Sequence, residues 1–466
     1  MTMQDWTLST LSDAIKDRRI SPTEIVGDCF DKIQRSKLHA FVTIDKSRAL
    51  EAAKKCESEL ARRAPCGPLH GVPLAHKDLF FVEGMPTSCG TRKPDYFIAE
   101  RTATAVARLE AAGAVTLGKL NMTELAMGPF GDNAYHGDVQ NPWLAGRSAG
   151  GSSSGSAAAV SSGLVYGALG SDTGGSIRQP AAYCGIVGLK PTYGLVSRSG
   201  AMPLSWSLDH VGPMARNVRD VALLLNAISG HDPADPTSTD RPNEDYLSQL
   251  GTAISDIRVG IPKNYYWSDL ETQTETAVRS AIDALGKLGA RLLDVELPDP
   301  QIINDISSLL TRAEGTAAHG AFARANPNVL QPVINARLGL GYQVSAYDYL
   351  QAMRLRSRLA QEFVRDIFSR VDVIATAVTP AEPPVVKESI AGDSEAVLKR
   401  MVYVTLLTRP FNGLGLPAAS VPCGFSEAGL PLAIQLIGRP FAEAQLLRVA
   451  HRYEQAFDWW KRRPPQ

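Results

Sequence analysis

The stretch 170–180 constrains this chain more than any other, because it packs two glycines and a serine into one tight turn. It reads Gly-Ser-Asp-Thr-Gly-Gly-Ser-Ile-Arg-Gln-Pro and ends in a proline that stops the run. The pair Gly174 and Gly175 leaves backbone N–H groups uncovered by side chains, so an anion can approach them closely. Ser176 follows directly, and its hydroxyl could attack a carbonyl carbon beside those donors. The turn alone predicts an anion-binding nest with a serine at its end.

The composition describes a globular chain without a dominant charge. Of the 466 residues, 44% are apolar and 21% are charged, and Lys plus Arg equals Asp plus Glu at 48 each. Such a composition is typical of soluble globular proteins. Because no net charge attracts a polyanion, we expect neither nucleic acid nor a membrane surface as a partner.

The N-terminus and the cysteines bear on location and on cofactors. Residues 1–20 contain no apolar core of a signal peptide, and no stretch of 18 apolar residues occurs in the chain. The six cysteines form no Cys-x-x-Cys pair and no Cys/His spacing typical of metal sites. We therefore expect a reduced, cytoplasmic protein that uses no metal and no other cofactor.

Short apolar segments alternate with amphipathic ones along the chain. Strands are predicted at 71–75, 114–117, 164–169, 257–261 and 371–375, and helices at 46–63, 104–112, 157–162, 271–288 and over most of 304–385. The run Ser-Pro-Thr-Glu predicts a helix start, with Ser21 as N-cap and Glu24 at N3. The alternation indicates an α/β fold with a largely parallel or mixed sheet in one continuous core.

Two further segments carry side chains suited to proton transfer. Lys77 lies between the apolar runs 72–75 and 79–82, which favour its burial. Desolvation lowers the pKa of a buried lysine, and the neutral amine can then act as a base beside a serine. The tract Gly-Gly-Ser-Ser-Ser-Gly-Ser at 150–156 precedes a predicted helix. We interpret this tract as a tight loop that collects N–H donors, rather than as a linker.

Together, these three segments resemble the signature of the amidase signature family of serine hydrolases. The resemblance spans most of the chain, from Pro-Leu-His-Gly-Val-Pro at 68–73 to Gly-Leu-Pro-Ala-Ala-Ser-Val-Pro at 415–422. Its most specific part is 150–180. One departure is Ser154, which stands where members of the family often have glycine.

The resemblance implies a fold and a division of the chain. We expect a single large α/β domain over 1–466, with a central mixed, twisted β-sheet flanked by helices on both faces. Within this domain we expect an N-terminal helical segment (1–65), a catalytic signature core (66–230) and a variable substrate-side region (about 231–400).

The same resemblance implies a role for each signature residue. Ser176 matches the nucleophile that forms the acyl-enzyme, Ser152 the bridging serine, usually with a cis peptide bond, and Lys77 the base of the proton relay. The N–H groups of Thr173, Gly174, Gly175 and Ser176 match the oxyanion hole of the family. Asp172 and Arg178 match the residues that hold this loop in place.

Substrate-binding residues are expected in segments that vary within the family. We place Met127 and Gly128 there, together with Phe130, Tyr135 and parts of 303–400. Their apolar and aromatic side chains indicate an apolar acyl or amine group. The expected function is therefore hydrolysis of a small amide, with anilides, carbamates and urea-like compounds left open.

A second function is compatible with the same triad. The chain could be the glutaminase-type A subunit of a tRNA-dependent amidotransferase, which passes ammonia to a charged tRNA. The segment 333–341 does not clearly match the substrate-arginine pattern of those subunits, and the Tyr-Asp-Gly motif expected near 290–345 is absent from the sequence. We therefore expect an amidase whose partner is a small-molecule amide, without nucleic acid or membrane, and a homodimer stays open.

Overall fold

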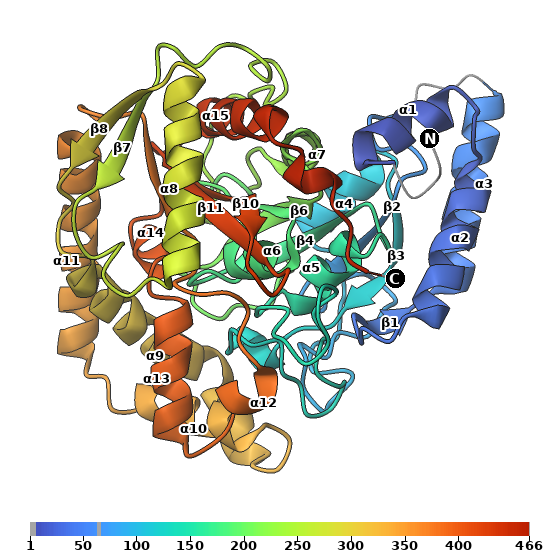
Figure 1. The fold of residues 1–466 in the computed structure, drawn as a ribbon. Coiled ribbons are helices and arrows are strands. Elements are labelled where there is room, and N and C mark those ends of the chain that lie inside the picture. The colour runs from blue at the N-terminus through green and yellow to red at the C-terminus, as the bar shows by residue number, and fades with distance from the viewer. Residues whose placement is uncertain (1–5, 63–66, 466) are drawn as a thin grey trace.

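The computed structural model describes residues 6–62 and 67–465. Residues 1–5, 63–66 and 466 lie outside the described residues, and they include Cys66 and both ends of the predicted N-terminal segment. In the part that is described, 15 α-helices surround one sheet of eleven strands (Figure 1).

The elements follow the predicted alternation of strands and helices. The strands are β1 (Phe41–Ile44), β2 (Pro73–Lys77), β3 (Val115–Leu120), β4 (Gly167–Asp172), β5 (Val187–Lys190), β6 (His210–Ala215), β7 (Arg258–Pro262), β8 (Arg291–Val295), β9 (Val373–Ala377), β10 (Ala418–Phe425) and β11 (Pro431–Gly438). The α-helices are α1 (Leu8–Lys16), α2 (Pro22–Arg35), α3 (Lys46–Ala61), α4 (Thr104–Ala111), α5 (Ser154–Ser161), α6 (Arg178–Cys184), α7 (Val218–Ile228), α8 (Thr272–Lys287), α9 (Pro300–Ala325), α10 (Pro332–Gly341), α11 (Ala346–Asp366), α12 (Val386–Ser389), α13 (Ser394–Val404), α14 (Arg409–Gly413) and α15 (Glu443–Ala456). Two 3₁₀ helices, η2 (Glu124–Ala126) and η3 (Asp458–Lys461), complete the description.

The sheet mixes parallel and antiparallel pairs. Its strand order is β1-β3-β2-β4-β6-β5-β10-β11-β9-β7-β8. β2 pairs in parallel with β3 and β4, and β7 pairs in parallel with β8 and β9. The other pairs are antiparallel. The prediction of one large α/β domain with a mixed sheet is therefore confirmed.

Helices cover both faces of this sheet. α5 and α6 pack against each other, and α6 contacts β5, β10 and β11. α7, α8 and α15 form a second group, in which α15 contacts both other helices as well as β10 and β11 (Figure 1). Both groups contact the same strands, and the described residues make no extensive contact between the two groups, so the groups lie on opposite faces, as the resemblance implies.

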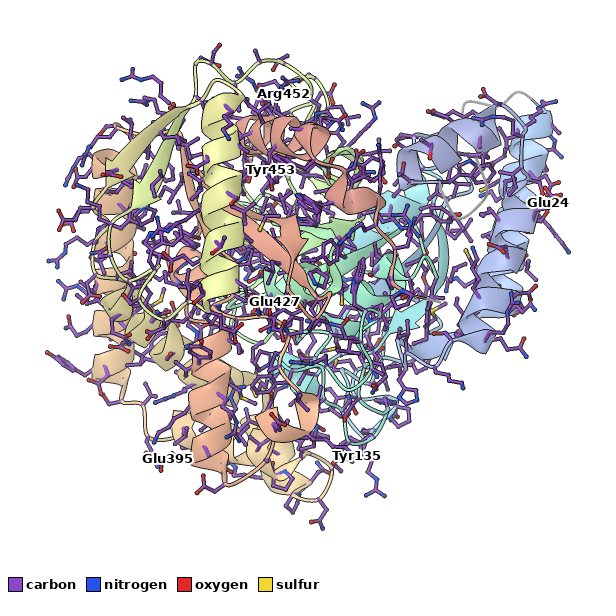
Figure 2. The ribbon with its side chains drawn as sticks, viewed as in Figure 1. Glu24, Tyr135, Glu395, Glu427, Arg452 and Tyr453 are labelled. Atoms are coloured by element: carbon purple, nitrogen blue, oxygen red, sulfur yellow. The ribbon has the colours of Figure 1, made fainter. Side chains whose placement is uncertain are left out.

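Helix α2 begins where the sequence predicts. Ser21 caps α2 by accepting a hydrogen bond from the Glu24 N–H at 3.1 Å, and the Glu24 carboxylate accepts one from the Ser21 N–H at 2.8 Å. This capping box satisfies two donors that a helix start leaves unpaired. Figure 2 shows Glu24 on the outer side of α2, away from the sheet.

The strands that carry the signature residues lie farther along the chain than predicted. β2 covers 73–77 instead of 71–75, and β4 covers 167–172 instead of 164–169. The two strands pair in parallel, with His76 opposite Leu169, and this pairing fixes their bounds. Because parallel strands end at the same edge of a sheet, Lys77 and the residues that follow Leu169 come to lie together.

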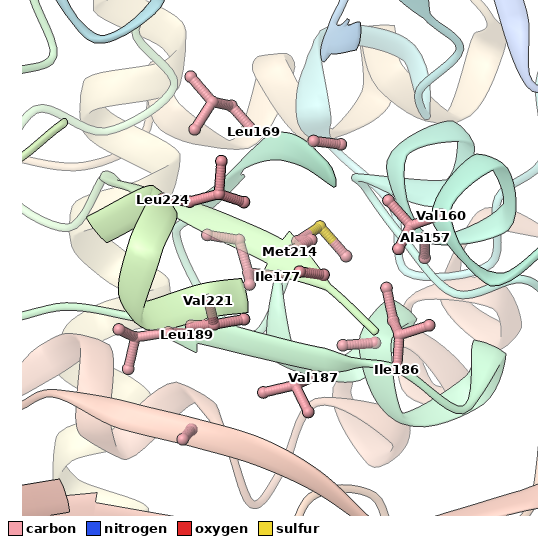
Figure 3. Packing of buried hydrophobic residues seen from close by; sticks show 14 of the residues in the cluster. Ala157, Val160, Leu169, Ile177, Ile186, Val187, Leu189, Met214, Val221 and Leu224 are labelled. Carbon is pink, nitrogen blue, oxygen red and sulfur yellow. The ribbon is translucent and has the colours of Figure 1, made fainter. Parts of the chain in front are cut away.

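The turn after β4 is anchored in the core by the residue that follows Ser176. The side chain of Ile177 is fully buried and packs near Met214 and Leu189 (Figure 3). Three strand glycines make room for it, since a Cβ added at Gly170, Gly188 or Gly212 would stand within about 3.0 Å of its carbons. Close packing of this kind holds a turn in one position.

Candidate active site

Lys77 stands at the end of β2, and its side chain is fully buried. Its Nζ atom donates hydrogen bonds to the Ser152 Oγ at 2.6 Å and to the Ser171 Oγ at 2.9 Å. Both serines are buried as well. The structure thus brings together Lys77 and Ser152, which the sequence separates widely, and it adds Ser171. Sequence reasoning missed Ser171, although the parallel register of β2 and β4 could have revealed it.

The surroundings of Lys77 favour a neutral amine. Burial lowers the pKa of Lys77 from 10.5 to about 7, and the negative charges of Asp172 and Asp209 counteract part of that shift. At neutral pH a large fraction of the lysine is therefore unprotonated and able to accept a proton. His76, the neighbouring residue, is buried, and neither ring nitrogen is hydrogen-bonded to any described residue; burial lowers its pKa to about 3.

The loop that carries Ser152 leads directly into α5. The Gly151–Ser152 peptide bond is cis, as the resemblance implies. The Ser153 N–H donates to the Ser176 carbonyl oxygen at 3.3 Å, and this bond joins the loop to the Thr-Gly-Gly-Ser turn. Ser176 is only partly buried and lines a cavity. Within the described residues, the Ser152 hydroxyl is hydrogen-bonded to Lys77 and not to the Ser176 hydroxyl.

Asp172 organises the turn between β4 and α6. Its carboxylate receives two bonds from the Arg178 guanidinium, at 2.9 Å and 3.0 Å, and one from the Asn412 amide at 2.8 Å. Asp172 and Arg178 are both fully buried. Burial alone would raise the pKa of Asp172, but the adjacent Arg178 holds it below its usual range. The ion pair therefore stays charged inside the protein.

The predicted oxyanion donors fall into two groups. The N–H of Gly175 donates to the Asp172 Oδ1 at 2.7 Å, so it is already engaged. The N–H groups of Thr173, Gly174 and Ser176 have no hydrogen-bond partner within the described parts of the chain. Gly175 adopts a φ of 133°, a conformation that favours glycine. Three N–H groups are thus free to face an anion.

A cavity of about 140 Å³ opens beside Ser176. Met127 and Gly128, which the sequence places at the substrate, line it together with Thr173 and Gly174. Leu125 and Ala126, just before Met127, have positive φ values of 49° and 59°, a strained backbone of the kind found at functional sites.

Two aromatic residues expected near the substrate do not line this cavity. Phe130 is fully buried in a small apolar cluster with Met401 and Val404. Tyr135 lies near the edge of the molecule, where Arg92 stacks over its ring (Figure 2). The cavity instead contains three arginines, Arg312, Arg337 and Arg409, that sequence reasoning did not single out. They come from separate helices, and only the packing of those helices joins them.

Few groups outside this site could hold a metal. Among the described residues, one group of ligand-type side chains gathers within 4.8 Å, namely Cys56, Glu59 and His70. The His70 Nε2 also lies 2.9 Å from the Cys56 carbonyl oxygen. None of the five described cysteines forms a disulfide, and Cys66 lies outside the described residues. No described helix combines the length and the apolar content needed to cross a membrane.

Comparison with known proteins gives a consistent result. Residues 24–447 match the family model described as Amidase. The chain is 41% identical over 484 residues to the A subunit of the glutamyl-tRNA(Gln) amidotransferase of Moorella thermoacetica, covering 98% of each chain. It is 40% identical over 485 residues to the same subunit of Dechloromonas aromatica, again covering 98% of each.

Solved structures agree with the sequence matches. A structure from a vestigial protein complex, which reveals the evolutionary origins of an s-triazine catabolic enzyme, has a TM-score of 0.90 and 32% identity, covering 97% of this chain and 98% of that one. The A subunit of the glutamyl-tRNA(Gln) amidotransferase of Thermotoga maritima has a TM-score of 0.82 and 32% identity, covering 98% of this chain and 95% of that one.

These matches correct one prediction and rank the two functions. The expectation of a small-molecule partner without nucleic acid is wrong, because the relatives are subunits of enzymes named for glutamyl-tRNA(Gln). The balanced net charge could not reveal this, since it describes the field of one chain and not of an assembly such as those to which these relatives belong. The relatives also favour the amidotransferase alternative over a generic amidase. The chain belongs to the amidase signature family.

Proposed function

We propose that this chain hydrolyses the C–N bond of a carboxamide through an acyl-enzyme on Ser176. The observation that carries the proposal is the buried hydrogen bond between the Lys77 Nζ and the Ser152 Oγ, at 2.6 Å. A lysine whose pKa is lowered to about 7 by burial can accept a proton there at neutral pH. Ser176 faces the adjacent cavity, where a substrate carbonyl has room.

In the first half of the reaction Ser176 displaces the amine. Lys77 accepts a proton from Ser152, which accepts one from Ser176, and the Ser176 Oγ bonds to the amide carbon. The proton then returns through Ser152 to the leaving nitrogen as the C–N bond breaks. A primary amide thus yields ammonia and an ester on Ser176.

In the second half water takes the place of the amine. It gives a proton to the relay, and its oxygen bonds to the ester carbon. The Ser176 Oγ leaves and regains a proton, so the carboxylic acid departs and the free enzyme returns. The net change is the addition of one water across one amide bond.

The turn supplies the oxyanion donors in both halves. We assign this role to the N–H groups of Thr173, Gly174 and Ser176, which are unpaired in the described structure. The N–H of Gly175 is held by Asp172, so Gly175 contributes mainly through its conformation. Asp172 and Arg178 fix the turn by their buried ion pair.

The predicted division of the chain is consistent with this assignment. Lys77, Ser152 and Ser176 come from the core 66–230, and the opposite wall of the cavity includes residues 308–312, 337–340 and 398–409. We propose that these later segments, mostly within the predicted substrate-side region, select the substrate.

A second candidate is the glutaminase-type A subunit of a tRNA-dependent amidotransferase. It is favoured by the relatives, which match at 41% and 40% identity over 98% of both chains. In that role the chain would release ammonia from glutamine and work in an assembly that acts on a charged tRNA. Anilides and carbamates remain further substrates to be tested for the same triad.

Labelling of the nucleophile tests the proposal directly. The purified chain should react with a fluorophosphonate probe, and peptide mass spectrometry should locate the probe on Ser176. Hydrolysis of glutamine and of simple amides should be measured on the same sample. Absence of both labelling and hydrolysis would reject the acyl-enzyme mechanism. Copurification with partner subunits, together with glutaminase activity, would support the second candidate.

A further inference from the structure

Three arginines line the cavity beside Ser176. Arg312 lies on α9 and Arg337 on α10, and Arg409 begins α14; these helices lie close together on one side of the molecule (Figure 1). Arg337 and Arg409 are half-buried, and Arg312 is exposed. Arg409 also packs beside Gly174, because a Cβ added at that glycine would lie 3.6 Å from its Nε. The cluster therefore reaches the turn that carries the nucleophile.

Neutral groups hold two of these arginines in place. The Arg337 Nη1 donates to the Met127 carbonyl oxygen at 2.6 Å, and it lies 3.8 Å from the Met401 Sδ. Arg409 donates to the Ser308 Oγ at 3.2 Å and to the Thr405 Oγ1 at 2.7 Å. These contacts orient the guanidinium groups without neutralising them.

No acidic residue balances the cluster inside the cavity. Among the described residues that line it, none is Asp or Glu, and none of the three arginines forms an ion pair. Asp305 and Asp348 line a second, adjoining cavity that Arg312 and Arg409 also line, and Asp305 accepts a hydrogen bond from Gln301 at 2.8 Å. Asp209 lies behind the wall, where it accepts a hydrogen bond from the Thr173 Oγ1 at 2.6 Å. The lining of the cavity next to the nucleophile is thus positively charged.

The three positive charges of the cluster repel one another. Burial lowers the pKa of Arg337 to about 10, and the charges of Arg409 and Arg312 act in the same direction. Burial likewise lowers the pKa of Arg409 to about 10, with Arg312 acting in the same direction and Asp305 against it. Both groups stay protonated at neutral pH, since 10 lies well above 7. Partly buried like charges without a counterion are unfavourable, and a bound anion would relieve them.

We propose that the acyl part of the substrate carries a carboxylate, which this arginine cluster binds, and that it carries no ammonium group. The proposal rests on the amide hydrolysis proposed above and names the class of amide. A guanidinium matches a carboxylate in both charge and geometry. An ammonium group beside the carboxylate would meet three positive charges and no carboxylate among the described residues that line this cavity. The favoured substrates are therefore half-amides of dicarboxylic acids.

This class differs from glutamine by a single group. Glutaramate is glutamine without its α-ammonium, and pentanamide replaces the carboxylate of glutaramate by a methyl group. The three amides share the reacting carboxamide and the chain length. Malonamate and succinamate keep the carboxylate and shorten the chain, so that they test the reach of the cavity.

Steady-state kinetics on this series tests the proposal. We expect the best half-amide to exceed pentanamide in kcat/KM by about 10- to 100-fold, the range of a hydrogen-bonded charge pair, and to exceed glutamine by at least about tenfold. The substitution Arg337→Met should reduce the preference for half-amide over pentanamide by about tenfold or more. Arg312→Met removes an exposed side chain of the same cluster and should reduce that preference without altering the fold.

Arg324→Met is the matched control. Arg324 lies on α9, as Arg312 does, but it stacks on the ring of Tyr342 and does not line the cavity. Its substitution should leave the preference unchanged. Equal rates for half-amides and pentanamide, or no effect of either cluster substitution, would overturn the carboxylate site. Glutamine as good as the best half-amide would overturn the exclusion of ammonium and favour the glutaminase role.

Labelling separates these failures from failure of the proposed function. If the fluorophosphonate probe labels Ser176 and none of the half-amides is hydrolysed, the substrate class is wrong while the nucleophile stands. If Ser176 is not labelled and no amide reacts, the acyl-enzyme proposal itself is wrong. Hydrolysis of half-amides with labelled Ser176 supports both.

Discussion

The Nζ of Lys77 lies 2.6 Å from the Oγ of Ser152, and both side chains are fully buried. A charged lysine at this place would have lost its water shell, so burial lowers its pKa to about 7. In the proposed relay, the same contact lets the amine accept the proton of Ser152, which in turn accepts the proton of Ser176. The activity of the protein should therefore depend on the protonation of a single lysine.

The rate of amide hydrolysis should rise with pH through neutrality. Lys77 is the base in its neutral form and its pKa is about 7, so protonation below that value should slow acylation by about tenfold per pH unit. The pH dependence of kcat/KM, measured with a neutral amide, should show this tenfold decrease per pH unit below about pH 7. Lys77→Arg places a permanently charged group there and should abolish activity at every pH. A flat profile between pH 5 and pH 8 would contradict the assignment.

Removal of the nucleophile should abolish turnover. Ser176→Ala should reduce kcat by about 10³-fold or more and prevent fluorophosphonate labelling. The control is Ser154→Ala at the start of α5, because the Ser154 hydroxyl is buried and has no hydrogen-bond partner among the described residues. Its loss should leave kcat within about threefold. Labelling of Ser176→Ala would show that another serine attacks.

The residues to which we assign the chemistry were predictable from the sequence. The Thr-Gly-Gly-Ser turn, the serine tract and Lys77 are recognisable because each needs a particular residue type at a particular place. The helix start at Ser21 was predictable as well, since a capping box depends only on local sequence. Local patterns of this kind can be recognised in a single sequence, because they involve only residues that are neighbours along the chain.

Contacts between distant elements were not predictable in the same way. Ser171 reaches Lys77 only because β2 and β4 pair in one register. Arg312, Arg337 and Arg409 meet only because their helices pack together. A lone arginine on a helix resembles any solvated charge, and Phe130, which the sequence places at the substrate, fills an apolar cluster instead. Tertiary packing decides these cases.

Breaking the buried ion pair should destabilise the protein. Arg178→Met leaves the Asp172 carboxylate without its partner, and loss of one member of a buried pair costs about 3–5 kcal/mol. Urea denaturation should show this as a lower midpoint. Arg178→Lys keeps the charge but cannot form both bonds, so part of the loss should persist. The exposed pair of Arg279 and Glu275 is the control, and Arg279→Met should change the midpoint little.

The two glycines of the turn should respond differently to the same substitution. Gly175 has a φ of 133°, and a Cβ there would overlap the Thr408 Oγ1, which itself donates to the Gly174 carbonyl oxygen at 2.7 Å. Gly175→Ala should therefore distort the turn and lower kcat by about 100-fold or more, in the range that loss of one oxyanion donor gives.

Gly174→Ala provides the matched test of this reasoning. The nearest atom to its added Cβ is the Arg409 Nε at 3.6 Å, an ordinary contact distance. We expect its kcat to stay within about tenfold of the parent, because its N–H is kept and the turn is undisturbed. Because the backbone strain should also make Gly175→Ala unfold at a lower urea concentration than Gly174→Ala, kcat should be measured on samples that circular dichroism shows to be folded. Equal losses of kcat in the two variants would refute the steric explanation, because only Gly175 lacks room for a methyl group.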